Sequence, residues 1–147
     1  KYLAAGDDSG VVQVWVLDNY KDPMILKGHG HQVWALAFSP NGRILASGDR
    51  SGQVRLWNLT NGTLQRTFEA HEDAVWSLAF SPDSQSLFFG SEDGTGLLWD
   101  LQSGDEARRF EGHRKAIRSV AFSSDGERSS RRWRRHSKKP KERWPTG

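Results

Sequence analysis

The side chains best suited to chemistry in this chain are its histidines, three of which recur at a fixed spacing. His29, His71 and His113 lie 42 residues apart. An imidazole can serve as a general base or a metal ligand, but either use requires partner groups gathered closely around it. A 42-residue step places one histidine in each repeated unit, so we expect structural roles for them. His31 departs from the spacing and is expected in a loop.

The chain lacks the other common patterns of catalytic and cofactor sites. No Ser/His/Asp set, paired carboxylates or phosphate-binding loop stands out, and the glycine-rich stretch Gly90–Gly96 precedes no predicted helix that could receive a phosphate. There is no cysteine, which excludes disulfides and thiolate chemistry. The sequence therefore predicts a protein that is not an enzyme and that has no cofactor and no metal site.

The 42-residue step extends well beyond the histidines. It is kept by three glycines, three tryptophans and the phenylalanines that open "FSPN", "FSPD" and "FSSD": Gly6, Gly48, Gly90, Trp15, Trp57, Trp99, Phe38, Phe80 and Phe122. Self-similarity at such a period is the mark of a repeat architecture, in which each unit is one supersecondary element.

One period divides into four short strands separated by turn residues. The alternating, β-branched and aromatic segments are Val33–Phe38, Ile44–Gly48, Val54–Leu59 and Thr63–Phe68. "SPNG", "DRSG" and "TNG" separate them, with Pro and Gly at positions that suit turns. Helical periodicity is absent from this period.

This pattern resembles the WD-repeat (β-transducin-like) family of β-propellers, in its bacterial form. The matching motifs are Gly28-His29 with Trp57-Asn58, His71 with Trp99-Asp100, and Gly112-His113. The resemblance covers Lys1 to about Gly126 and implies an all-β fold of blades with four antiparallel strands. It predicts two complete blades plus two part-blades, divided as 1–27 part-blade, 28–69 blade, 70–111 blade and 112–126 start of a blade. The part-blades would contain strands within Tyr2–Leu26 and a first strand at Ala116–Phe122.

The resemblance also implies a structural hydrogen-bond network of His, Ser or Thr, Trp and Asp in each blade. Buried imidazole, hydroxyl and indole groups each need such partners. The second blade offers His29, Ser47 and Trp57, with Ser51 where Asp is usual. The third blade offers His71, Asp93 and Trp99, with Phe89 in the hydroxyl position, and the fourth begins with His113. The first part-blade has Ala5, Ser9 and Trp15. We therefore expect no blade to hold the full set.

Candidate partner-binding residues follow from the same resemblance. Five residues after each repeat histidine come Trp34, Trp76 and Arg118, at a position that opens onto the upper mouth of the channel in this family. Asp8, Arg50 and Glu92 face that surface from the turns. Exposed Trp and Arg side chains are frequent hot spots of binding. The alternative is that Trp34 and Trp76 only pack between blades, as most aromatic residues in strands do.

The number of blades raises the question of closure, because propellers typically have four to eight. We expect the chain to be a fragment of a longer protein, since it starts within a blade and without an initiator Met. The alternative is a strand-swapped dimer, in which two chains exchange end strands and close a six-bladed ring. An isolated monomer would expose strand edges and apolar faces, which predicts aggregation.

The last residues form a basic tail, 127–147, with nine Lys/Arg against two Glu. Interleaved Arg, Lys and Trp residues could bind nucleic acid by phosphate neutralisation and base stacking. The alternatives are a solvated disordered tail and a shifted reading frame. In a frame one nucleotide later, 132–137 can encode Gly-Gly-Ala-Asp-Thr-Val, which resembles Gly90–Thr95 exactly one period earlier in the chain. Sequencing the DNA in all three frames tests this hypothesis.

The sequence predicts a non-catalytic protein–protein interaction scaffold, with other proteins as partners. We expect it to be cytoplasmic with no membrane segment, because no apolar run approaches the 18 or so residues of a spanning helix. One alternative is nucleic-acid binding through the basic C-terminal tail. Another is that these repeats belong to a larger bacterial signalling enzyme, whose catalytic domain would lie outside these 147 residues.

Overall fold

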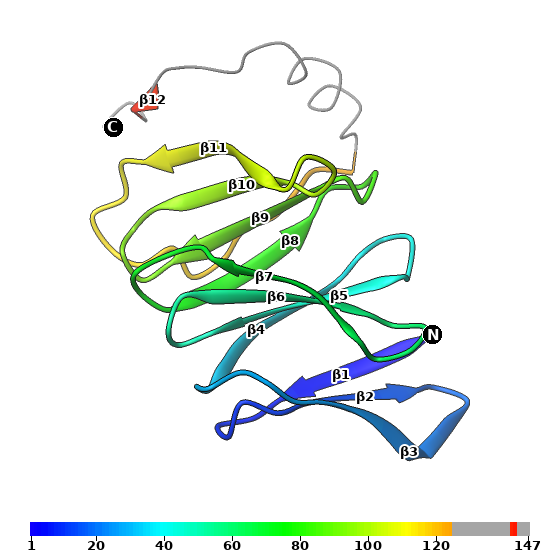
Figure 1. The fold of residues 1–147 in the computed structure, drawn as a ribbon. Helices are drawn as coiled ribbons and strands as arrows, with labels where there is room; N and C mark the ends of the chain where they lie inside the picture. Colours follow the sequence, from blue (N-terminus) through cyan, green and yellow to red (C-terminus); the bar gives the residue numbers. More distant parts are fainter. Residues whose placement is uncertain (125–141, 144–147) are drawn as a thin grey trace.

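The computed structural model describes residues 1–124 and, as backbone, 142–143. Within these residues the secondary structure is entirely β (Figure 1). The first sheet contains β1 (Tyr2–Gly6), β2 (Val12–Val16) and β3 (Asn19–Leu26). The second contains β4 (Val33–Phe38), β5 (Ile44–Asp49), β6 (Gln53–Asn58) and β7 (Leu64–Glu69). The third contains β8 (Val75–Phe80), β9 (Ser86–Ser91), β10 (Gly96–Asp100) and β11 (Asp105–Glu111).

These sheets confirm the predicted fold class of antiparallel four-stranded blades. Each complete sheet is a meander in which neighbours in sequence are neighbours in space, and β1–β3 supply three strands of a further blade. The predicted strand Val33–Phe38 is found with the same bounds, and the other three in its period differ by one residue at one or both ends. The period-2 pattern and the turn residues were therefore sufficient to place these strands.

The prediction of a strand at Ala116–Phe122 is wrong. This segment is extended but forms no ladder with another strand of the described residues. It lies along the third sheet, where the Ile117 N–H donates to the Ser91 carbonyl (2.9 Å) and the Val120 N–H donates to Ser77 Oγ (3.1 Å). A strand is defined by its pairing partner, and an apolar alternating segment without one remains an irregular extended chain.

The predictions made for the basic tail, 127–147, lie outside the described residues except for β12 (Glu142–Arg143). That short strand pairs in parallel with β11, with Phe110 opposite residue 142 and Glu111 opposite residue 143. The readings of this segment as a nucleic-acid-binding, disordered or frame-shifted tail stay predictions.

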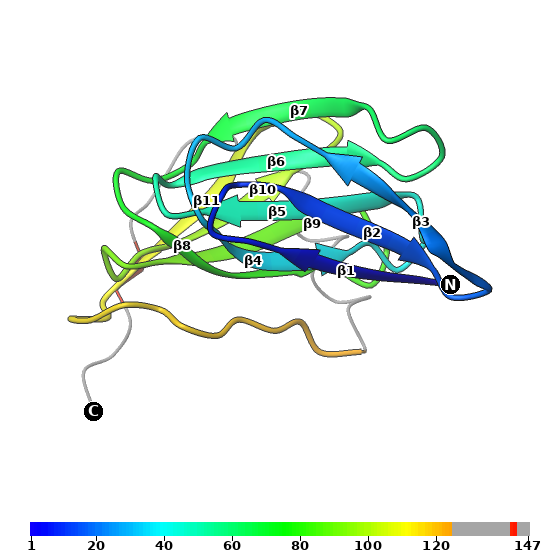
Figure 2. The same cartoon turned by 90° about the horizontal axis from the view of Figure 1, so that it is seen from below.

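The three sheets follow one another side by side in chain order, from β1–β3 at the bottom of Figure 1 to β8–β11 at the top. In the view from below, their strands run lengthwise in nearly the same direction (Figure 2). Equivalent parts of each sheet therefore meet equivalent parts of the next. The turn glycines Gly10 and Gly52 illustrate this, because each lies against the backbone carbonyl of the histidine that begins the next repeat.

The repeated glycines at the end of β1, β5 and β9 permit this close stacking. A Cβ atom built at Gly48 would lie 2.6 Å from Cγ1 of Val75 on β8. Gly6 meets Val33 in the same way, and Gly90 meets Ile117. Since real Cβ atoms do not approach so closely, only glycine allows β4, β8 and the 117 segment to lie where they do. The sequence spacing of these glycines thus reflects the spacing of the sheets.

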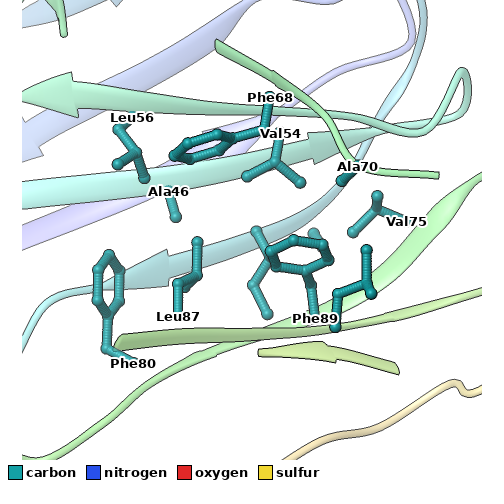
Figure 3. Packing of buried hydrophobic residues seen from close by; sticks show 12 residues of the cluster. Ala46, Val54, Leu56, Phe68, Ala70, Val75, Phe80, Leu87 and Phe89 are labelled. Carbon is teal, nitrogen blue, oxygen red and sulfur yellow. The ribbon is translucent and has the colours of Figure 1, made fainter. Parts of the chain in front are cut away.

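Apolar side chains fill the two spaces between the sheets. Between the second and third sheets, Leu56 and Phe68 face Phe80, Leu87 and Phe89 (Figure 3). Between the first and second sheets, a smaller cluster includes Val12, Val14, Leu26, Leu45 and Trp57. Only the second sheet contributes to both layers of core, and burial of these side chains is the main force that holds the three sheets together.

Candidate functional site

The second sheet contains a buried chain of hydrogen-bonded side chains. His29 precedes β4, Ser47 and Asp49 lie on β5, and Trp57 lies on β6. His29 Nδ1 is 2.7 Å from Asp49 Oδ2, and His29 Nε2 is 2.6 Å from Ser47 Oγ. Trp57 Nε1 donates to Ser47 Oγ at 2.8 Å. The chain therefore connects the loop before β4 to the two central strands of the sheet.

One arrangement of protons satisfies every group in this chain. Trp57 N–H donates to Ser47 Oγ, the Ser47 hydroxyl donates to His29 Nε2, and neutral His29 donates from Nδ1 to Asp49. A Ser–His–Asp order with these distances is also found at nucleophilic active sites. Here the Ser47 side chain is 0% exposed and its oxygen already accepts the indole N–H, so no substrate can reach it. The geometry therefore supports a structural role.

Asp49, and not Ser51, is the acid of the second sheet, so the expectation that no blade holds the full set was wrong. Ser51 instead donates to the other carboxylate oxygen of Asp49, from its N–H at 2.9 Å and its hydroxyl at 2.6 Å. Asp7 and Ser9 repeat this arrangement in the first sheet. The recurrence of Asp-x-Ser at a 42-residue step was the sequence signal that could have identified Asp49.

The third sheet holds only half of the chain. His71 Nδ1 lies 2.9 Å from Asp93 Oδ2, and Thr95 donates to the other oxygen of Asp93. Phe89 replaces the serine, with its ring edge-on to His71 and stacked on Trp99. His71 Nε2 and Trp99 Nε1 are buried without a hydrogen-bond partner in the described residues. The position of Phe89 in sequence correctly indicated this gap.

Burial and hydrogen bonds set the protonation of these groups. Burial lowers the pKa of His29 and of His71 below the ordinary histidine value, although the neighbouring Asp49 and Asp93 act in the opposite direction. Burial acts to raise the pKa of Asp49, but hydrogen bonds from Ser51, His29 and Gln53 outweigh it and keep the pKa low. The pKa of Asp93 is also lowered, since hydrogen bonds from Thr95 outweigh its burial. Both pairs therefore favour neutral histidine beside an ionised carboxylate.

A second cluster lies at the start of the first strands, where the structure brings four of the candidate partner-binding residues together. The rings of Trp34 on β4 and Trp76 on β8 are stacked, with centroids 4.3 Å apart and planes inclined by 32°. The Arg118 guanidinium carbon lies 4.5 Å from the centroid of the Trp76 ring. Trp76 Nε1 also donates to a Glu92 carboxylate oxygen. We call Trp34, Trp76 and Arg118 the stacked row.

The remaining candidates lie apart from this row or at its margin. Arg50 is exposed in the β5–β6 turn, with its guanidinium 3.5 Å from Gln32 Oε1, and Asp8 is exposed in the β1–β2 turn. His113 is exposed in the segment after β11, so it does not share the buried position of His29 and His71. His31 is exposed in the loop before β4, where the spacing placed it.

The described residues hold no group of three or more His, Cys, Asp or Glu side chains that could bind a metal. The same part of the chain has no helix long and apolar enough to cross a membrane.

A protein-family model described as "WD domain, G-beta repeat" matches residues 21–58, 62–100 and 104–130. These three matches together cover more than half of the chain. The first match runs from β3 to the end of β6 and the second from β7 to the end of β10. Each of these two sequence repeats therefore joins the last strand of one sheet to the first three strands of the next. Among curated proteins, no sequence matches this chain.

Proposed function

This chain belongs to the WD domain, G-beta repeat family, and on that premise we propose that it is a scaffold that binds another protein through the stacked row. Repeats of this family are generally protein-interaction scaffolds and are typically non-catalytic. The proposal assigns the binding surface to Trp34, Trp76 and Arg118, with Arg50 and Glu92 at its margin. Catalysis has no part in it.

The observation that carries this proposal is the pairing of two partly exposed tryptophans. Trp34 is 37% exposed although it stacks on Trp76, and Arg118 beside them is exposed as well. Trp and Arg are enriched at the energetic centres of protein interfaces, and charged residues are usual at the rim. Packing between blades and binding are both compatible with this geometry, because each ring keeps an accessible edge or face.

The buried hydrogen-bond chain supports the proposal by fixing the platform. Val33 and Val75, the residues just before the two tryptophans, are buried between the sheets. His29 is fixed to β5 through Ser47 and Asp49, which holds the loop that leads into β4. A preordered surface loses less conformational entropy on binding than a mobile one. The rigid sheets therefore favour recognition by the exposed rings.

The test is affinity capture with the full chain, followed by binding measurements with the purified partner. Trp34→Ala removes the exposed ring of the row. Tyr20→Ala is the matched control, because Tyr20 is an aromatic residue with 61% exposure on β3, away from the row. We expect Trp34→Ala to weaken binding at least about ten-fold, the effect of a typical hot spot, while Tyr20→Ala leaves it unchanged. Equal binding by both folded variants would contradict the proposal.

A further inference from the structure

The Trp76 side chain is partly exposed and has three neighbours of different chemistry. Trp34 and Arg118 both lie within 4.5 Å of its ring centroid. The indole N–H at the ring edge donates to Glu92. Trp76 thus contacts a second tryptophan, a cation and a carboxylate.

This arrangement has the chemistry of a guanidinium-binding site. The face of an indole ring attracts cations more strongly than any other side-chain ring, and a planar guanidinium can stack on it. The Glu92 carboxylate at the edge of the same ring places a negative charge near the bound cation. The Glu92 N–H donates to the Ala74 carbonyl and Ser91 Oγ to the Asp73 carbonyl, so the acidic stretch Glu72–Asp73 adjoins this turn.

Arg118 is held in this site by few other contacts. Its side chain is exposed, and among the described residues no hydrogen bond or ion pair of its guanidinium group accompanies the ring contact. The segment around it pairs with no strand that the structure describes, and the Ile117 and Val120 N–H groups fix it to the third sheet. An exposed long side chain loses rotamer entropy when it is held in one place. Displacement of the Arg118 guanidinium from the ring would therefore break no hydrogen bond or ion pair of that group among the described residues.

We propose that Trp76 and Glu92 form a binding site for a guanidinium group, that Arg118 occupies it in the free protein, and that an arginine of the protein partner displaces Arg118. This inference rests on the proposed function, because it assumes that the partner approaches the stacked row. It adds the chemical class of the recognised group and makes Arg118 an intramolecular competitor.

The test uses the full chain and two probes, acetyl-Gly-Arg-Gly-amide and the same peptide with citrulline, which keeps the shape of arginine without its charge. Binding is followed by NMR through the indole N–H signal of Trp76, identified by its loss in Trp76→Phe. We expect Arg118→Ala to bind the arginine peptide about two- to five-fold more tightly than the unaltered chain, in line with the strength of an exposed cation–π contact. The citrulline peptide should bind more weakly than the arginine peptide in both proteins.

Three further variants keep the outcome interpretable. Arg114→Ala removes an exposed arginine from the same segment, and we expect it to bind like the unaltered chain. Glu92→Gln keeps the size of the side chain without its charge and should weaken binding of the arginine peptide. Should Arg118→Ala not fold, Arg118→Gln removes the charge while keeping much of the length. Equal affinity of Arg118 variants and unaltered chain, or equal binding of both peptides, would overturn the inference.

Failure of this inference is distinguishable from failure of the proposed function. If Trp34→Ala weakens partner binding but the two peptides bind alike, the stacked row still docks the partner and the guanidinium site is wrong. If Trp34→Ala leaves partner binding unchanged, the docking surface itself is wrong, whatever the peptides do.

Discussion

At the scale of single residues, the second and third sheets form a natural comparison of a complete and an interrupted hydrogen-bond chain. Ser47 links His29 to Trp57, and Phe89 at the equivalent position links nothing. The sequence alone revealed Phe89 because it lies at the expected step. It did not reveal Asp49, because the acid comes from Asp49 in one sheet and from Asp93, two residues later in register, in the other. Only the backbone path shows that both carboxylates reach their histidine.

Removing the Ser47 hydroxyl, which links His29 to Trp57 in the second sheet, should lower the stability of the folded protein. Ser47→Ala leaves His29 Nε2 and Trp57 Nε1 buried without partners, so we expect a loss of about 2 kcal/mol or more in the free energy of unfolding. Urea denaturation measures it. Ser123→Ala, at an exposed serine, is the control and should change stability by less than about 0.5 kcal/mol. Similar losses of stability in the two variants would contradict the structural role of this chain of hydrogen bonds.

Placing a hydroxyl at position 89 of the third sheet should not make the protein more stable. Phe89→Ser offers partners to His71 Nε2 and Trp99 Nε1, a gain of about 1 kcal/mol for each hydrogen bond. It also removes a fully buried ring from the core between the sheets, and such a loss costs about 3–5 kcal/mol. We therefore expect the variant to be less stable in urea denaturation. A variant more stable than the unaltered chain would show that the unpaired groups dominate.

Stability should fall as the pH is lowered through the range where histidine titrates. Because the pKa of His29 and of His71 is lower in the folded state, the unfolded chain binds more protons between the folded value and about 6.5. The stabilisation of the fold by the two neutral histidines is therefore fully present above about pH 6.5 and is lost as the pH falls below that value. The low pKa of Asp49 and of Asp93 adds a further loss below about pH 3.8.

The measurement is the urea midpoint as a function of pH between 7.5 and 5. We expect His71→Gln to flatten this profile, since one of the two buried histidines is gone. Ser123→Ala, which alters an exposed side chain that does not titrate in this range, should keep the slope. If the urea midpoint of His71→Gln depends on pH as steeply as that of the unaltered chain, the pH dependence does not come from the buried histidines.

At the scale of strands and sheets, the alternating sequence pattern was sufficient where a strand has its neighbours in the chain. It placed β4–β7 closely because the turns between them are short and rich in Gly, Asn and Ser. It failed at Ala116–Phe122, because the pattern records which side chains are apolar and not whether a pairing strand is present. The contact between β5 and β8 through Gly48 could be read only from the structure.

The close approach of Gly48 to Val75 should make this position intolerant of a larger side chain. Gly48→Ala adds a methyl group against Val75, so β8 must shift, and we expect a loss of about 1–3 kcal/mol in stability from overpacking. Gly30→Ala is the matched control, since a Cβ there meets nothing within 4 Å. Urea denaturation of both variants measures the difference. Equal stability of the two would show that the sheets are not packed as closely as described.

At the scale of the whole molecule, successive sheets bring equivalent positions together at one end of the strands. The spacing of 42 residues indicated that Trp34, Trp76 and Arg118 are equivalent. It did not show that they touch, or that Trp34 keeps more than a third of its surface exposed. Contact and exposure depend on the distance between sheets, which the core side chains and glycines set. The proposed docking surface is thus a product of the stacking of the sheets.

A protein partner should dock on the end of the sheets that carries the stacked row. Photo-crosslinking tests it most directly, with a photoreactive amino acid at position 50, beside the row, or at position 20, on β3. Both native residues are exposed. We expect a crosslinked partner from position 50 and none from position 20. A crosslink from position 20 alone, or equal yields from both, would contradict it.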